Sequence, residues 1–196
     1  MPRIPRHAAL AVFGLLVIAL VAACGGTADA SFDATGPCTA DGQAVGAYPD
    51  LETMIPSRYM DASPERLDSG RDCSAEKLGS LADAGITELR HAGGTWTFGA
   101  ERAAVLAVFT APGLTASQLA DLYLQTATTA SRTKITSATT QTIAGRSGRR
   151  LDTETGSRSQ TVVVWPSTTP DVVNVIITND LPDARIDDAV AAFAGR

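Results

Sequence analysis

A single histidine follows the N-terminal apolar segment, and this limits the nucleophilic chemistry that the chain can carry. A Ser-His-Asp hydrolase needs a histidine to accept the serine proton, and His91 is the one candidate beyond His7. The Gly-x-Ser-x-Gly elbow of α/β-hydrolases is absent, because residues 145–148 read Gly-Arg-Ser-Gly. We therefore expect that the protein is not an enzyme. A hydrolase that uses His91 as its base is kept as the last of three functions.

Four arginines make the main basic concentration of the chain. An arginine fork matches the geometry of phosphate and carboxylate groups. The sequence around them does not reproduce the Gly-x-x-x-x-Gly-Lys-Ser/Thr phosphate loop. We interpret the group as a candidate anion-binding patch for lipid headgroups or cell-wall polyanions, with a solvated hairpin surface as the alternative. Its members are Arg146, Arg149, Arg150 and Arg158.

The densest acidic group lies near the C-terminus, between Asn179 and Asp188. Calcium takes oxygen ligands of this kind. Asp183 instead suits the N-cap of a final helix. Asp187 and Asp188 would then lie early in that helix, near the end that favours negative charge. We assign no metal site and no cofactor.

The first 24 residues have the layout of a secretory signal peptide. Arg3 and Arg6 precede an apolar run over residues 8–21, and Ala22-Ala23-Cys24 follows. This pattern resembles the lipobox of bacterial lipoproteins, which implies cleavage before Cys24 and a lipid on that cysteine. A retained transmembrane helix is one alternative, but its 14 residues fall short of the roughly 20 that a span needs. A signal peptide that is cut elsewhere is the other.

Lipidation of Cys24 leaves Cys38 and Cys73. In an oxidising extracytoplasmic space we expect these two to form a disulfide. A metal site, the alternative, needs further ligands at close spacing.

Length and charge then bound the mature protein. Residues 1–23 are the expected signal peptide, residues 24–37 a lipidated flexible tether, and residues 38–196 a single domain. Loss of Arg3 and Arg6 leaves 14 basic against 21 acidic residues, a net charge of −7. So acidic a chain is a poor general binder of nucleic acid.

Residues 38–85 read as a disulfide-closed helical segment. We expect one short helix capped by Asp50, a second starting at Ser63-Pro64, and a better one over residues 74–84 that ends at Gly85.

Residues 86–196 read as a sheet with two main helices. Thr115 and Gln118 predict a capping box for a helix that runs to Ala130, and Asp183 caps the last helix. Gly93-Gly94 is expected to be a turn between two strands. Short turns between consecutive strands predict antiparallel pairing and an α+β fold. The expected strands are residues 86–91, 95–98, 102–110, 140–143, 148–153, 160–165 and 172–178.

The order of these elements resembles the PsbP-like superfamily, which includes lipid-anchored actinobacterial lipoproteins. The matching pieces are AVLAVFTAPGLTASQLADLY, TIAGRSGRRLDT, QTVVVWP, VVNVIIT and ARIDDAVAAF. The resemblance implies an αβα sandwich, an antiparallel sheet packed between helices, and a non-catalytic binding or assembly role. It transfers no ligand residue. The segment before Ile86 departs from the family pattern and either completes the same fold or forms a separate layer.

We thus expect a lipid-anchored, non-catalytic binding or assembly domain of the bacterial envelope, outside the cytoplasmic membrane. The first alternative is an accessory factor that docks to an envelope protein without a small ligand. An apolar cleft between the 116–130 helix and the sheet could hold a lipid tail, although core packing explains the same aromatic residues: Trp96, Phe98, Phe109, Tyr123, Trp165 and Phe193.

Overall fold

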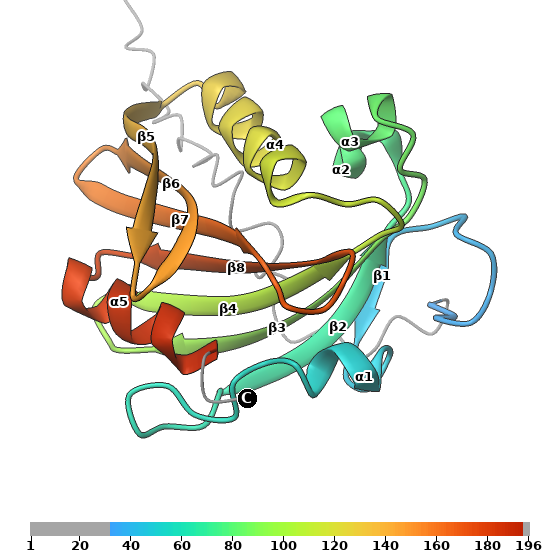
Figure 1. Cartoon of the computed structure of the whole chain (residues 1–196), viewed down its shortest axis with the longest axis horizontal. Helices are drawn as coiled ribbons and strands as arrows, with labels where there is room; N and C mark the ends of the chain where they lie inside the picture. Colours follow the sequence, from blue (N-terminus) through green and yellow to red (C-terminus); the bar gives the residue numbers. More distant parts are fainter. Residues whose placement is uncertain (1–31, 194–196) are drawn as a thin grey trace, which may run out of the picture.

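A computed structural model describes residues 32–193. They form one eight-stranded sheet in which every neighbouring pair is antiparallel, in the order β1-β2-β3-β4-β8-β7-β6-β5 (Figure 1). The strands are β1 (Gly42–Ala44), β2 (Arg66–Asp72), β3 (Leu89–Thr97), β4 (Ala103–Thr110), β5 (Thr133–Ile143), β6 (Arg146–Thr155), β7 (Arg158–Pro166) and β8 (Val172–Asn179). The helices are α1 (Pro49–Glu52), α2 (Ala75–Leu78), α3 (Ser80–Asp83), α4 (Ala116–Thr129) and α5 (Asp183–Ala192).

The expectation of an α+β sandwich is wrong, because the described chain is predominantly β. Strand accounts for 41% of it and helix for 23%, and α1, α2 and α3 have only four residues each. The expected helical segment over residues 38–85 contributes β1 and β2 to the sheet. Residues 66–72 form a strand because all seven pair with β3, a contact between distant segments that local sequence does not report.

Three local expectations fail for identifiable reasons. The helix over residues 74–84 is split at Gly79, whose φ of 49° interrupts helical geometry between α2 and α3. Gly93-Gly94 is no turn, because β3 continues through both residues and pairs with β2 and β4 on either side. The helix caps at Asp50 and Asp183 also differ, since Tyr48 and Pro182 occupy the N-cap positions without side-chain hydrogen bonds.

Elements with strong local signals are confirmed. Thr115 and Gln118 form the capping box of α4: the backbone N–H of Gln118 donates to Thr115 Oγ1 at 3.2 Å, and the backbone N–H of Thr115 donates to Gln118 Oε1 at 2.8 Å. The β5–β6 hairpin turns through Ala144 and Gly145, which both have positive φ. The apolar segments at β4, β7 and β8 form the buried centre of the sheet.

Helices lie against both faces of the sheet and divide the core in two (Figure 1). We call the face packed against α4, with α2 and α3, the α4 face. Its core includes Leu119 and Ala107. The opposite side, the α5 face, packs against α1 and α5, and its core includes Trp96 and Trp165. Odd-numbered residues of β3 and β4 lie on the α4 face and even-numbered ones on the α5 face, as the alternation of a strand requires.

Candidate binding site

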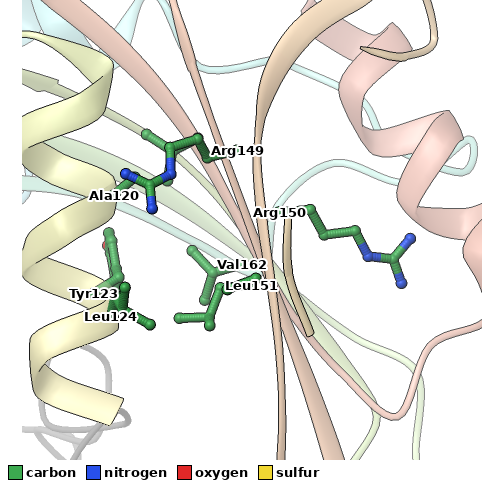
Figure 2. A pocket seen from close by; sticks show the side chains of 9 residues that line it. Ala120, Tyr123, Leu124, Arg149, Arg150, Leu151 and Val162 are labelled. Atoms are coloured by element: carbon green, nitrogen blue, oxygen red, sulfur yellow. The ribbon is translucent and has the colours of Figure 1, made fainter. Parts of the chain in front are cut away.

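The four candidate anion-binding arginines do not lie on one surface. Figure 2 shows Arg149 directed toward α4 and Arg150 directed toward α5, as neighbours along one strand must be. Arg146 pairs with Ile143 at one end of β6, whereas Arg158 pairs with Thr155 at the other end, nine residues or roughly 30 Å away.

Three of these arginines are ion-paired with acidic residues of the domain. Arg149 pairs with Asp121 of α4, and Arg158 pairs with Glu101. Arg150 donates to Asp152 at 2.9 Å and to Asp183 at 2.7 Å. Their charge serves to connect β6 and β7 with neighbouring elements.

The acidic group near α5 is engaged in similar local contacts. Asp180 accepts hydrogen bonds from the backbone and hydroxyl of Ser159 at 2.8 and 3.2 Å, and Asp188 pairs with Arg185 at 3.2 Å. Within residues 32–193, no group of three or more His, Cys, Asp or Glu side chains is placed to hold a metal ion.

The expected cleft directly beneath α4 is packed. Tyr123 and Leu124 of α4 face Leu151 and Val162 of the sheet (Figure 2), and the space between them is about 10 Å³. This is room for about one water molecule, so a lipid tail does not fit there.

A larger opening lies on the same face beyond the edge of α4, over β2, β3 and β4. The register places Gly93 opposite Ala107, so two very small side chains adjoin at this point. Larger side chains stand one row of residues away on either side of this pair, and we call the depression between them the trough. The floor of the trough is Gly93 and Ala107. One wall is formed by His91 and Phe109, and the other by Thr95, Val105 and Ile177. Tyr123 closes one end, and the residues that border the open end are Gln43, Arg66 and Asp68.

The trough is partly open to solvent and its volume is about 40 Å³, room for about three water molecules, so a longer ligand would lie along it with part of its surface exposed. Its depth comes from Gly93. A Cβ built on this residue would lie 3.7 Å from Ala107 Cβ and 3.7 Å from Val105 Cγ1, which is ordinary contact. Since packing does not require a glycine at position 93, the missing side chain leaves unfilled space on the floor.

His91 forms one wall of the trough and has an unusual environment. Its ring lies 5.8 Å from the ring of Phe109, and its Nδ1 atom is buried with no hydrogen-bond partner. Asp72 Oδ2 is 3.9 Å from Nδ1, too far for a hydrogen bond. Burial lowers the pKa of His91 to about 4, and Lys77 adds to this effect, so the imidazole is neutral near pH 7.

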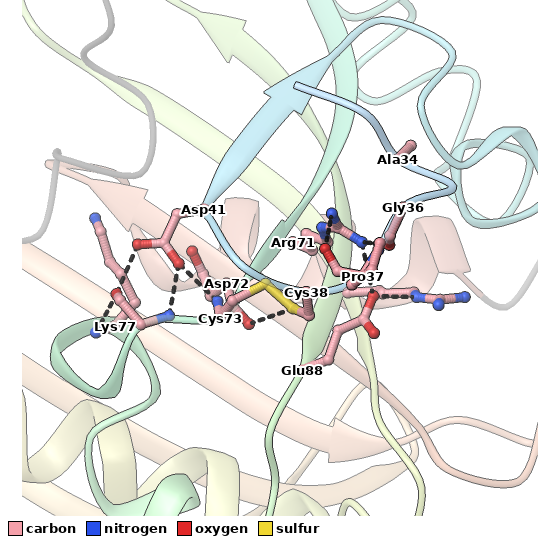
Figure 3. The surroundings of a disulfide bond; sticks show 12 residues. Ala34, Gly36, Pro37, Cys38, Asp41, Arg71, Asp72, Cys73, Lys77 and Glu88 are labelled. Carbon is pink, nitrogen blue, oxygen red and sulfur yellow. Dashed lines mark hydrogen bonds and ion pairs between the residues drawn. A yellow bond between two sulfur atoms is a disulfide. The ribbon is translucent and has the colours of Figure 1, made fainter. Parts of the chain in front are cut away.

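Asp72 lies behind His91, beside the confirmed disulfide between Cys38 and Cys73 (Figure 3). Burial raises the pKa of the Asp72 carboxyl to about 6, Asp41 raises it further, and Lys77 opposes the shift. Asp41 itself accepts hydrogen bonds from Cys73 N and Ser74 N, at 2.6 and 2.8 Å. The carboxyl groups of Asp72 and Asp41 therefore lie behind the wall that His91 forms.

Arg71, two residues before Cys73, holds the segment that precedes Cys38. The buried guanidinium of Arg71 donates to the carbonyl oxygens of Asp33, Gly36 and Pro37 at 2.9, 2.7 and 2.9 Å (Figure 3). These three residues lie in the expected tether over residues 24–37, so the C-terminal part of that stretch is hydrogen-bonded to β2. Cys24 and the expected signal peptide lie outside the described residues.

A hydrolase at His91 would need an acid beside the imidazole and a nucleophile within hydrogen-bonding distance. Asp72 meets the first requirement in part. No serine, threonine or cysteine among residues 32–193 hydrogen-bonds to His91. This arrangement favours a role for His91 as part of the trough wall over a role as a general base.

Sequence reasoning identified His91 but missed the trough. The available signal was Gly93, which was assigned to a turn. Reading residues 89–97 as one strand would have placed His91, Gly93 and Thr95 on a common face.

No protein-family model and no curated protein matches this chain. The likeness to the PsbP-like superfamily therefore stays a sequence-based prediction. Across residues 32–193, no helix has the length and apolar character needed to cross a bilayer.

Proposed function

We propose that the mature protein is a lipid-anchored, non-catalytic binding domain of the bacterial envelope, outside the cytoplasmic membrane, and that the trough is its binding site. The proposal combines the expected lipid at Cys24 with a disulfide that suits an oxidising compartment. The trough is the observation that carries it.

The trough has the features of a small-molecule site. Ala107, Val105, Phe109 and Ile177 give the floor and walls a large carbon surface, into which His91 and Thr95 bring polar groups, and the other polar side chains border the ends. Binding sites for small ligands typically combine apolar walls with a few placed polar groups.

Attachment near the membrane would supply such ligands. Seven residues separate Cys24 from Phe32, and the eight steps between them limit their distance to about 30 Å even for a fully extended chain. A lipid on Cys24 would therefore hold Phe32, and the domain that follows it, close to the bilayer surface.

The proposal is tested by what the protein carries when it is purified from its own membrane. Wild type, Gly93→Val and the control Thr139→Val would be purified in parallel, and organic extracts compared by mass spectrometry. Thr139 is an exposed residue of β5 that pairs with Arg150 on the α5 side of the sheet, so its valine leaves the trough unchanged. We expect a molecule that accompanies wild type and Thr139→Val and is depleted from Gly93→Val.

Two results would overturn the proposal. One is a set of identical extracts from all three proteins. The other is an N-terminal peptide of the native protein without lipid on Cys24. A protein partner that crosslinks equally to wild type and Gly93→Val, with no extracted molecule, would favour the envelope-docking alternative.

A further inference from the structure

We propose that the trough binds a single linear aliphatic chain whose hydroxyl group donates a hydrogen bond to Nε2 of His91. This inference rests on the proposed function and specifies the chemical class of the ligand.

The shape of the trough favours a thin, extended occupant. Its floor runs from Asp68 on β2 through Gly93 to Ala107 on β4 and crosses two strand intervals, roughly 10 Å at the usual strand spacing. The floor is narrow, since Gly93 and Ala107 are each flanked by larger side chains one row away. A branched or globular ligand would contact the walls before it reached this floor.

A peptide is a poor occupant for a physical reason. The trough runs across strands whose backbone N–H and C=O groups already pair in the ladders from β2 to β8. A peptide lying across them would bury its own backbone polar groups without partners, which is costly. An alkyl chain has no such groups.

His91 determines the polar group of the ligand. The proton of a neutral imidazole resides on one nitrogen, and the carboxylate of Asp72 beside Nδ1 favours its position there. Nε2, at the far corner of the ring, is then left with a lone pair and can only accept a hydrogen bond. A ligand that uses it must be a donor.

The bonding capacity of Nε2 excludes an anionic headgroup. Asp72 lies behind the ring at 3.9 Å from Nδ1, and Asp41 and Lys77 lie beyond it. Asp68 at the open end is ion-paired with Arg66, so charges of both signs surround the trough and do not decide the headgroup. A carboxylate or phosphate can accept but not donate at neutral pH, so it cannot form a hydrogen bond with Nε2. An ammonium group would be desolvated against carbon walls and a neutral imidazole, which is unfavourable. A hydroxyl group is uncharged and can donate a hydrogen bond, so it suits this site.

The experiment compares four probes of equal chain length by calorimetric titration: 1-octanol, octanoate, octylamine and heptyl methyl ether. The protein is the mature chain carrying Cys24→Ser, which needs no detergent that would compete for the trough. We expect 1-octanol to bind about five-fold more tightly than the ether, from the value of one hydrogen bond, and octanoate to bind more weakly than both.

Two variants locate the interaction. Gly93→Val should weaken 1-octanol at least ten-fold, while Thr139→Val should leave its affinity unchanged. His91→Phe should reduce 1-octanol to the affinity of the ether without changing the ether, and circular dichroism would verify its fold. If His91→Phe does not fold, His91→Gln, which retains an acceptor, should keep the preference for 1-octanol.

The inference is overturned if octanoate or octylamine binds more tightly than 1-octanol, or if 1-octanol and the ether bind equally. It is also overturned if no probe binds while a molecule still co-purifies with wild type and is lost from Gly93→Val, a result that leaves the proposed function intact. Equal binding of 1-octanol to wild type and Gly93→Val would contradict both.

Discussion

Gly93 and Gly94 are consecutive residues of β3, yet they face opposite sides of the sheet and have opposite structural roles. A Cβ on Gly94 would lie 2.8 Å from the Trp96 ring and 3.0 Å from Ile55 Cγ2, so the α5 face needs a glycine there. A Cβ on Gly93 would have only ordinary contacts. One glycine permits close packing and the other leaves space unfilled.

The same contrast holds for the two faces. The α5 face is closed by Tyr59, Trp96 and Phe98, whose rings meet edge to face at 5.8 Å. On the α4 face, the helix covers β5 to β8 and leaves the small residues of β3 and β4 open at the trough. We infer that the α5 face contributes mainly to stability and the trough mainly to binding.

The largest expected effect is on the closed face. Trp96 is 1% exposed, and its indole nitrogen donates to the Ala62 carbonyl at 3.0 Å. Trp96→Ala should lower the free energy of unfolding by about 3–5 kcal/mol, because it leaves a cavity and removes one of the two hydrogen bonds to the Ala62 carbonyl. Urea denaturation measures this, with Phe109→Leu in the trough wall as the comparison at under about 1.5 kcal/mol. Equal losses at the two positions would remove the distinction between the faces.

The next effect is a pH dependence in the wall of the trough. The folded pKa of His91, about 4, lies below its unfolded value of 6.5, so the unfolded state binds more protons and His91 makes stability rise between pH 4 and 6.5. The folded pKa of Asp72, about 6, lies above 3.8, so Asp72 makes stability fall as pH rises from 3.8 to 6. Each shift corresponds to about 3 kcal/mol, and the two trends largely cancel in wild type.

Single variants should separate these trends in urea denaturation at pH 4, 5, 6 and 7. The free energy of unfolding of wild type, less that of Asp72→Asn, should fall as pH rises. The free energy of unfolding of wild type, less that of His91→Gln, should rise as pH rises. Differences that do not change with pH would show that neither group is buried as the structure has it.

Gly94→Ala should cost about 1–3 kcal/mol, since the added methyl group must displace Trp96 or Ile55. The melting temperature of this variant, measured by differential scanning calorimetry, is the readout. A variant as stable as wild type would mean that the α5 face is less tightly packed than we infer.

Gly93→Ala should have the smallest effect on stability, and of the opposite sign. Replacing a strand glycine with alanine stabilises by up to about 1 kcal/mol when no contact is strained. The same calorimetric scan measures it beside Gly94→Ala. Strong destabilisation would show that position 93 is packed rather than open.

How much the sequence predicted depended on how local the signal was. The α4 capping box spans residues 115–118 and was predicted correctly, because all its partners lie within one turn of helix. β2 was missed, since its sequence is polar and glycine-containing and its pairing with β3 joins residues that are 17 to 29 positions apart. The fold class was wrong for this reason, as two strands were assigned to a helical segment.

Prediction of the site was likewise limited by contacts between distant segments of the chain. His91 was identified as a residue of interest, but its neighbour Asp72 becomes a diagonal partner only through the β2–β3 register. Arg149 and Arg150 were grouped by sequence, although strand alternation directs them to opposite faces. The trough depends on the register of Gly93 against Ala107, which no segment contains by itself.

The most direct test of the open trough compares two alanine methyl groups on β4 by ¹³C NMR during titration with 1-octanol. Ala107 lies on the floor of the trough, while Ala104 is fully buried on the α5 face. The account predicts that the Ala107 methyl resonance shifts to saturation and that the Ala104 resonance stays in place. A shift of Ala104 with no shift of Ala107, or no shift of either, would contradict it.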